Sequence, residues 1–355
     1  VERTETYLVA ERNPYYPFVD KKGNQLPYID KFRLNLANSE EMVNTKATTG
    51  EATIAARFLK TTDIPLYKKY ENQGNYSTHL FTSGRGAEIY IMPNLNHKDP
   101  KLKKIFQDVR FRRAISLGMN RQVIDEKIYF GKSVSRQHTL IPTSKYYEKK
   151  HADSYIEFNP EKANKLLDEM GMKDVNGDGY RELPNGEIFK PTLLFLEAGM
   201  PATAILELIV NDWEEIGINI NLKQVSKGLM TTRKYSNNWD MSIWRGDRTV
   251  DVIFPAQLNV TFAPVGSDSR WSPWVSWCQW DASGGEEGTE PPEEIKELLI
   301  KPATTFLNSS DENARFKAAE NLLKAQAENL WTIGTVGMAP RAVIVSNKLH
   351  NVPEK

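Results

Sequence analysis

Strand-like and helix-like patterns of hydrophobic residues alternate through the first hundred positions of the chain. Hydrophobic and polar residues alternate with a period of two over 31–36, which predicts a half-buried strand, and further strands are predicted at 78–81 and 87–92. A polar helix is predicted from Ser39 to a stop at Gly50. Interleaved strands and helices of this kind indicate an α/β layer architecture.

From residue 108 onwards, hydrophobic residues recur at helical spacing and predict helices over 109–117 and 121–129. The clearest helix follows Asn159, which can cap its first turn. It carries Pro160 where a helix tolerates proline, and Gly171 ends it.

Three arginines, Arg110, Arg112 and Arg113, fall in the first of these helices. A basic triplet of this kind fits either an anion site or a solvated helix face. The solvated face is the commoner arrangement, and the sequence leaves both open.

A strand, a helix and a second strand follow one another between residues 191 and 225. The strand is predicted at 191–196, the helix at 202–216 and the returning strand around 218–222. This order predicts a βαβ crossover with parallel strands. A further strand is predicted at 239–244, whose end then lies at the next strand of the same sheet.

Helices dominate the C-terminal part before a final apolar strand at 342–345. One helix is predicted at 293–299. Ser309 and Glu312 have capping-box spacing for a longer amphipathic helix that extends through Leu330.

The stretch from Asn238 to Asp281 holds six of the eight tryptophans of the chain. Tryptophan offers a large, stiff surface that stacks on ligand rings or fills interfaces, so a cluster this dense beside fixed charges suggests a recognition surface. The alternative is that these indoles only pack in a hydrophobic core.

The most informative part of this stretch is Trp244-Arg245-Gly246-Asp247-Arg248, at the end of the strand predicted over 239–244. Open α/β sheets bind ligands outside the ends of their strands, so side chains held there in a loop are well placed to face a ligand. The Asp247 carboxylate could accept a hydrogen bond from an amine or a sugar hydroxyl. Alternatively, Arg245 or Arg248 simply neutralises it at the surface.

Composition excludes some classes of function but does not identify the function. The 355 residues include 46 basic and 46 acidic side chains, which argues against a nucleic-acid or polybasic membrane-surface protein. No run of 18 apolar residues is present, and the single cysteine, Cys278, can form no internal disulfide. The chain opens in strand-like sequence at 6–10 without a signal peptide, as expected of a piece of a longer protein.

The segment Asp174-Val175-Asn176-Gly177-Asp178-Gly179 is similar to the first half of an EF-hand calcium loop. The twelfth position of such a loop needs a bidentate glutamate, and here it is Asn185. A tight turn closed by an aspartate side chain is therefore the preferred interpretation, with calcium left open. The histidines have no metal-ligand spacing, so no zinc site and no cofactor are expected.

Several motifs, in order along nearly the whole chain, together resemble the family 5 extracellular solute-binding proteins of ABC transporters, the oligopeptide and dipeptide-binding group. The segments that carry the resemblance are Arg12-Asn13-Pro14-Tyr15-Tyr16, Gly50-Glu51-Ala52-Thr53-Ile54, residues 108–121, Asn159-Pro160-Glu161-Lys162-Ala163, and residues 239–247.

The resemblance implies an α/β fold like that of type II periplasmic binding proteins, with two lobes and a cleft, the first lobe being incomplete in this chain. Residues 1–107 would form the later part of lobe one, 108–325 the second lobe, and 326–355 the returning segment of lobe one. In peptide-binding members, the aspartate of a Trp-x-Gly-Asp motif binds the ligand's α-amino group, and Asp247 matches it. After Asp247 the sequence departs from the family pattern, which often continues with Tyr and an Asp-Pro pair.

The leading hypothesis is a non-enzymatic receptor that captures a small solute and delivers it to a membrane permease. A peptide is the first expectation for the solute and an oligosaccharide the alternative. The expected ligand-binding residues are Trp244, Arg245, Gly246, Asp247, Trp271, Trp274 and Trp277. We expect a monomer that binds no nucleic acid and lies in the periplasm or outside the cell, with lipid anchoring left open.

The competing hypothesis is a carbohydrate-active enzyme, because aromatic platforms and carboxylates also fit sugars. Glycoside hydrolysis needs two carboxylates placed across the scissile bond. Asp240, Asp247, Asp251, Glu286 and Glu287 are available, but nothing in their spacing singles out a pair.

Overall fold

The computed structural model describes residues 1–267 and 270–353, and these divide into two compact units. Unit 1 consists of Val1–Leu59, Pro65–His79 and Val343–Pro353, and unit 2 is formed mainly by Leu80–Ala342, with Lys60–Ile64 added. Each unit is described by itself. The lobe boundaries that the resemblance implies stay a prediction.

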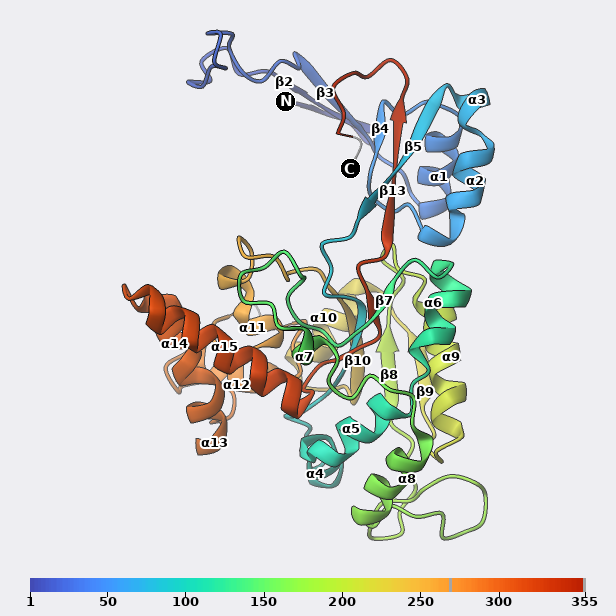
Figure 1. Ribbon diagram of the computed structural model, residues 1–355, viewed down its shortest axis with the longest axis vertical. Coiled ribbons are helices and arrows are strands. Elements are labelled where there is room, and N and C mark those ends of the chain that lie inside the picture. Colours follow the sequence, from blue (N-terminus) through green and yellow to red (C-terminus); the bar gives the residue numbers. More distant parts are fainter. Residues whose placement is uncertain (268–269, 354–355) are drawn as a thin grey trace. The chain divides into compact units, whose positions relative to one another are not determined.

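Unit 1 contains two small sheets. One has the order β1 (Glu2–Arg3), β2 (Tyr7–Glu11), β3 (Lys31–Asn35), and the other has the order β4 (Ile54–Ala55), β13 (Pro340–Ser346), β5 (Tyr76–Thr82). The helices α1 (Glu40–Thr48), α2 (Ile64–Lys69) and α3 (Glu71–Gly74) lie beside the second sheet (Figure 1). Ser39 caps α1 as predicted, because its hydroxyl accepts a hydrogen bond from the Met42 amide at 3.2 Å.

Strand β3 differs from its prediction as a half-buried strand. All five of its residues are exposed, including Phe32 and Leu34. Apolar and polar residues do alternate along β3, but no described element covers its apolar side. The pattern therefore predicted burial of side chains that are exposed.

Unit 2 is built around a five-stranded sheet with the order β11-β6-β10-β8-β9. Strand β8 runs parallel to β9 and to β10, whereas β6 runs antiparallel to β10 and to β11. The strands are β6 (Ala87–Pro93), β8 (Thr192–Phe195), β9 (Asn221–Gln224), β10 (Met241–Gly246) and β11 (Ile333–Gly334), and a separate pair joins β7 (Val134–Ser135) to β12 (Val336–Gly337).

Helices complete unit 2, and the colours of Figure 1 show their order along the chain. The longer ones are α4 (Pro100–Gln107), α5 (Val109–Leu117), α6 (Arg121–Tyr129), α8 (Pro160–Glu169), α9 (Ala202–Glu214), α10 (Lys227–Tyr235), α12 (Val275–Ala282), α14 (Lys301–Asn308) and α15 (Glu312–Asn329). The short ones are η1 (Thr61–Asp63), α7 (Lys149–Ala152), η2 (Pro255–Gln257), α11 (Leu258–Thr261), α13 (Glu293–Ile295) and the π-helical turn η3 (Lys296–Ile300).

The predicted crossover is confirmed by β8, α9 and β9, since β8 and β9 pair in parallel. Strand β9 begins at Asn221 rather than at Ile218. Helix α9 packs inward through Trp213, which is fully buried and donates its indole N–H to the Ile115 carbonyl at 2.8 Å.

Alternate residues of each central strand enter two different hydrophobic cores. Ile91 of β6 and Ile243 of β10 belong to the larger core, whereas Tyr90 and Trp244 belong to a smaller one. Successive side chains of a strand point to opposite faces of its sheet, so the sheet of unit 2 is covered on both faces. The tryptophan-rich stretch contributes to both cores.

The predicted capping residue of the long C-terminal helix was wrong. Ser309 ends α14, and α15 is capped instead by Asp311, whose carboxylate accepts the Asn313 amide at 2.9 Å. Asp311 is a stronger cap than a serine two positions earlier, because it directly precedes the first helical turn.

Within the arginine triplet, Arg112 and Arg113 form neither an anion site nor a solvated face. Arg112 is buried and donates to the Asn329 carbonyl at 2.7 Å, and Arg113 donates to the Glu328 carbonyl at 2.8 Å. The last carbonyls of a helix have no partner within it, so these arginines cap the C-terminal end of α15.

Candidate functional site

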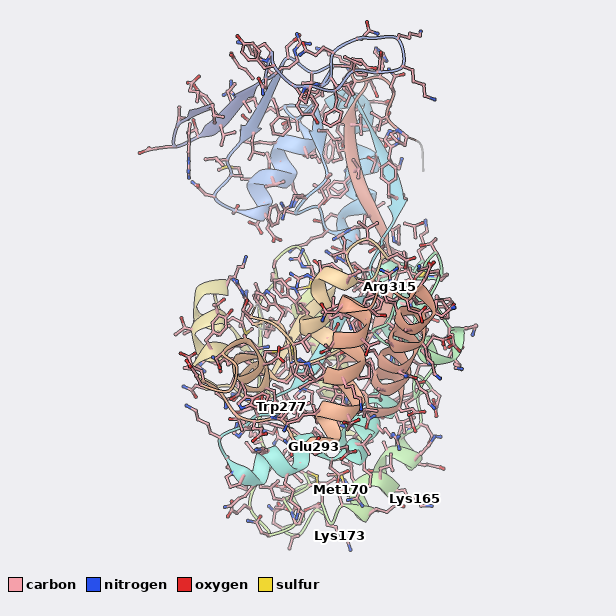
Figure 2. All side chains as sticks on the ribbon, turned by 90° about the vertical axis from the view of Figure 1, so that its left-hand side faces the viewer. Lys165, Met170, Lys173, Trp277, Glu293 and Arg315 are labelled. Carbon is pink, nitrogen blue, oxygen red and sulfur yellow. The ribbon has the colours of Figure 1, made fainter. Side chains whose placement is uncertain are left out.

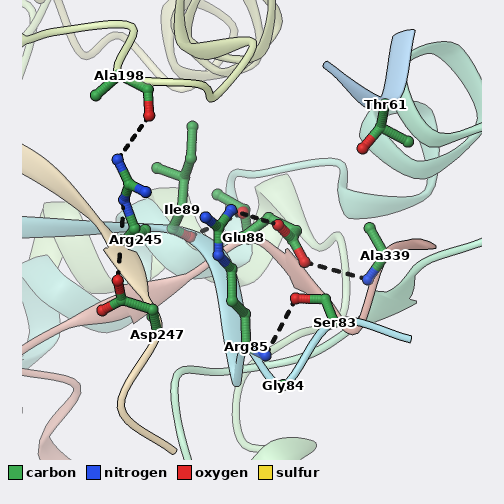
Figure 3. Close-up of polar contacts among 12 residues, drawn as sticks. Thr61, Ser83, Gly84, Arg85, Glu88, Ile89, Ala198, Arg245, Asp247 and Ala339 are labelled. Carbon is green, nitrogen blue, oxygen red and sulfur yellow. Dashed lines mark hydrogen bonds and ion pairs between the residues drawn. The ribbon is translucent and has the colours of Figure 1, made fainter. Parts of the chain in front are cut away.

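The carboxyl ends of the parallel strands β8 and β10 bring the candidate residues to one edge of the sheet of unit 2. The loop after β8 contains Ala198, and its carbonyl accepts a hydrogen bond from Arg245 Nη2 at 2.6 Å (Figure 3). Ala198 has a φ of 45°, a left-handed conformation that is costly for a residue other than glycine. The strained loop and the end of β10 are therefore held together at the edge where open α/β sheets bind ligands.

Gly246 ends β10 at an irregularity in its pairing with β6. A Cβ atom at this position would lie 2.6 Å from the His138 ring and 2.7 Å from the Ala87 backbone. Only glycine therefore fits without movement of the surrounding backbone. The strand thus ends at a glycine that packs closely against the neighbouring backbone.

Asp247 follows Gly246 and lies between two guanidinium groups. Its carboxylate oxygens are 4.0 Å from Arg245 Nε and 3.7 Å from Arg248 Nε, and its side chain is 42% exposed. These separations are ion pairs without a short hydrogen bond. Partial exposure keeps such pairs weak, at about 0 to 1 kcal/mol each, so Asp247 stays open to another partner.

Trp244 and Trp271 stack face to face, with ring centroids 3.6 Å apart and planes inclined by 9°. Both are more than nine-tenths buried and belong to the smaller core of unit 2. The Tyr90 hydroxyl donates a hydrogen bond to the Trp271 carbonyl at 2.8 Å and so fixes the backbone at Trp271. The indole N–H of Trp244 is buried and has no hydrogen-bond partner in the described chain.

The other two tryptophans of the expected set lie in the interior. Trp274 is fully buried and meets Trp331 edge to face at 5.9 Å. Trp277 is 3% exposed and belongs to the larger core; it is labelled in unit 2 in Figure 2. The packing alternative therefore describes Trp274 and Trp277, and Trp271, at 4% exposure, is buried almost as deeply as Trp277.

A buried ion pair next to the candidate residues was not anticipated. Arg85 Nη1 lies 3.0 Å from Glu88 Oε2, and both side chains are less than a tenth exposed (Figure 3). The other carboxylate oxygen of Glu88 accepts the Ala339 amide at 3.2 Å. Arg85 and Glu88 are only three residues apart, but their burial depends on contacts with distant segments such as the one that holds Ala339, and no local motif marks it.

The loop that resembles a calcium site forms the predicted turn closed by an aspartate side chain. Asp174 accepts the Gly177 amide at 2.7 Å and the Gly179 amide at 2.9 Å. Oxygens of Asp174, Asp178 and Glu182 lie within 4.8 Å of one another, a grouping that the sequence interpretation missed because it looked for a ligand at Asn185. The oxygens of Glu182 already accept hydrogen bonds from Val175 and Asn176.

Two cavities open on the surface of unit 2 away from the candidate residues. One, of about 170 Å³, is lined by Lys145, Tyr146, Pro255, Phe306, Leu307 and Arg315. The other, of about 250 Å³, lies beside the Asp174 loop and is lined in part by Arg181 and Glu215. Neither is lined by Trp244 or by any residue of 245–248.

Comparison with known proteins identifies the family of the chain. The family model described as "Bacterial extracellular solute-binding proteins, family 5 Middle" matches residues 1–258. The chain belongs to this family. It has the α/β fold of type II periplasmic binding proteins, as the resemblance predicted. In the part of this family 5 protein that the structure describes, we find no helix both long and apolar enough to cross a membrane.

Relatives of this family 5 protein are binding proteins for different solutes. The periplasmic alpha-galactoside-binding protein of Rhizobium meliloti is 22% identical over 99% of this chain and 50% of its own length. An oligopeptide-binding protein OppA of Lactococcus lactis subsp. lactis is 24% identical over 65% of this chain and 38% of its own length. The chain spans half or less of the length of these curated relatives.

Solved structures similar to this family 5 protein cover nearly the whole chain. An oligopeptide-binding protein OppA is 30% identical with a TM-score of 0.71, covering 100% of this chain and 58% of that one. The periplasmic binding protein MelB of Agrobacterium fabrum, in complex with stachyose, is 23% identical with a TM-score of 0.78. The similarity covers 99% of this chain and 52% of that one.

Proposed function

We propose that this chain belongs to the substrate-binding component of an ABC importer, a non-enzymatic receptor that captures a small solute. Membership of the family over residues 1–258 carries the proposal. The cluster of charged and aromatic residues at the carboxyl ends of β8 and β10 supports it, since this edge is where α/β sheets bind ligands. The receptor acts as a monomer in the periplasm or outside the cell and delivers its solute to a membrane permease.

Within this proposal, the solute-binding residues are Trp244, Arg245, Gly246, Asp247 and Trp271. Asp247 and Arg245 fix polar groups of the solute, and the stacked pair Trp244–Trp271 backs the site with a rigid aromatic layer. Gly246 holds the loop close to β6. Trp274 and Trp277 support this layer from the interior and do not touch the solute.

A peptide is the first candidate solute, supported by the oligopeptide-binding relatives. The half-exposed Asp247 carboxylate would then accept a hydrogen bond from the peptide's α-ammonium group, a charge-assisted contact worth about 1.5 to 3 kcal/mol. Asp247→Asn is expected to weaken the binding of a tripeptide by tenfold or more in isothermal titration. The control Glu286→Gln removes an exposed carboxylate elsewhere, and unchanged peptide affinity in Asp247→Asn argues against this role.

An oligosaccharide is the second candidate, favoured by the Trp244–Trp271 stack and by the alpha-galactoside-binding relative. The two indoles cover one face of each other, so a sugar ring would pack against an outer face of the stack, and replacement of either tryptophan should then weaken sugar binding more than Asp247→Asn does. Titration of the tetrasaccharide stachyose against Trp271→Leu and Asp247→Asn separates the two candidates, with the melting temperature of each variant as a check on folding.

The experiment that tests the proposal directly is mass spectrometry of small molecules that remain bound through purification, followed by titration of each molecule found. A receptor binds its solute reversibly and returns it unchanged. Release of hydrolysis products from any candidate sugar or peptide would show instead that the protein is an enzyme.

A further inference from the structure

The cavity of about 170 Å³ in unit 2 has no part in the proposed function. Apolar or aromatic residues and two cations line it, namely Tyr146, Pro255, Phe306, Leu307, Lys145 and Arg315. Tyr146 and Phe306 are buried, whereas Lys145 and Arg315 are exposed. The cavity therefore has an aromatic interior and a positively charged mouth.

The interior of the cavity belongs to a cluster of aromatic rings. Tyr146 meets Phe306 edge to face, with ring centroids 5.8 Å apart, and lies 5.3 Å from the Phe316 ring. The Phe254 ring lies 5.2 Å from that of Phe306. Aromatic pairs at such separations attract each other beyond the burial of their area, so a further ring that enters the cavity extends the cluster favourably.

Contacts between distant segments hold the wall of the cavity in place. The Asp251 carboxylate accepts the Lys145 amide at 3.2 Å, which joins the segment of Tyr146 to the loop that carries Pro255. Phe254, next to Pro255, is fully buried in the larger core of unit 2. A wall that is already ordered saves a ligand the entropic cost of ordering it.

The two cations at the mouth are available to a ligand. Arg315 lies near the start of α15 and is labelled in Figure 2, and its guanidinium forms no ion pair with any residue that the structure describes. Lys145 Nζ lies 3.4 Å from Glu312 Oε1, but these side chains are 51% and 76% exposed. An ion pair so exposed is weak, so Lys145 can exchange it for a ligand.

The size of the cavity limits the ligand to one ring. An apolar cavity of about 150 Å³ can hold a benzene molecule, so this cavity of about 170 Å³ has room for a single aromatic ring. A substituent on that ring would reach the mouth. A carboxylate suits the mouth because its planar geometry matches a guanidinium group.

We propose that this cavity is a binding site for a small, free aromatic carboxylate. The ring packs against Tyr146 and Phe306, and the carboxylate contacts Arg315 and Lys145. None of the proposed solute-binding residues lines the cavity. The inference therefore adds a second ligand class at a second site and does not depend on the proposed function.

Two probes that share a ring and differ in charge test the site by fluorine NMR titration of the whole chain. They are para-fluorobenzoate and the neutral para-fluorobenzamide. The benzoate is expected to bind at least tenfold more tightly than the amide, and its affinity should decrease as salt is raised, because ions screen charge interactions. Acetate has the charge without the ring and should not displace it at equal concentration.

Variants then assign the binding to the cavity. Arg315→Gln should weaken para-fluorobenzoate binding at least fivefold and leave the amide within twofold, whereas Arg315→Lys should retain part of the affinity. The matched control Lys317→Gln removes the same charge from an exposed position of α15 that does not line the cavity, and should change neither probe. Arg315 is exposed, so Arg315→Gln should keep its melting temperature; if it does not, Lys145→Gln serves in its place.

Equal affinity for the two probes, or no saturable binding of the benzoate at millimolar concentration, overturns the inference. So does benzoate affinity that is unchanged in both Arg315→Gln and Lys145→Gln. Loss of benzoate binding in Arg245→Gln would place the probe at the proposed solute-binding residues instead, which also overturns it. The proposed function is judged separately, by titration of the solute that remains bound through purification.

Discussion

Replacing Lys234 should remove a large pH dependence of stability. Lys234 is fully buried in α10, and its Nζ donates to Ser242 Oγ at 2.9 Å and lies 4.0 Å from the centre of the Trp239 ring. None of its partners is a carboxylate, and burial lowers the pKa of Lys234 well below its ordinary value of 10.5. At a pH between the folded-state and the unfolded-state pKa, the folded protein therefore holds this amine neutral while the unfolded chain holds it protonated.

The sign and size of the effect follow from this difference. Above pH 10.5 both states are neutral and Lys234 carries no penalty. As the pH falls, only the unfolded state gains the proton, so the free energy of unfolding decreases by about 1.4 kcal/mol per pH unit until the folded-state pKa is reached. Over the part of the range from pH 9.5 to 7.5 that lies above the folded-state pKa, this one group lowers the free energy of unfolding at that rate.

The measurement is urea unfolding at pH 7.5 and 9.5, followed by tryptophan fluorescence. Lys234→Met keeps an unbranched side chain of similar length and removes the charge. The loss of stability on going from pH 9.5 to 7.5 should be smaller in this variant than in the parent, by up to about 1.4 kcal/mol per pH unit. The control Lys227→Met replaces an exposed lysine of the same helix and should leave the pH dependence as it is. Equal pH dependence in the parent and in Lys234→Met would refute the argument.

Three further changes test the surroundings of the candidate site. Gly246→Ala should destabilise unit 2 by about 1 to 3 kcal/mol, since its Cβ would overlap the Ala87 backbone, whereas Gly228→Ala, with nothing within 4 Å, should not lower the melting temperature. His138 is buried and its pKa is lowered to about 3, so stability should decrease as the pH falls from about 6.5 towards 3, and thermal melts of His138→Leu should lose that component. Glu88→Gln leaves the buried Arg85 guanidinium without its counter-charge and should cost about 3 to 5 kcal/mol in urea unfolding. An unchanged unfolding midpoint in Glu88→Gln would mean that water reaches Arg85.

The local elements could be predicted because their signals lie in neighbouring residues. Asn159 with Pro160 marks the beginning of α8, and the Asn159 side chain accepts the Lys162 amide at 2.9 Å as such a cap should. The parallel pairing of β8 with β9 follows equally directly from the strand, helix and strand pattern. In both cases the residues that determine the local structure lie in one short stretch of sequence.

The candidate site was predicted only in part, because burial depends on contacts between distant segments. The sequence placed Trp244 and Asp247 at the end of a strand, and the structure agrees. It could not tell that Trp274 is sealed against Trp331, or that Arg245 reaches the Ala198 carbonyl, since neither relation leaves a local pattern.

The order of strands in the sheet of unit 2 has a consequence for synthesis. Strand β6 is buried at all seven positions and lies between β10 and β11, yet β11 is Ile333–Gly334, near the C-terminal end of the chain. A ribosome makes β6 long before β11, and until then one side of an apolar strand presents unpaired amides and carbonyls that can recruit another chain. Nascent or C-terminally truncated forms of this protein are therefore expected to aggregate and to depend on a chaperone that shields β6.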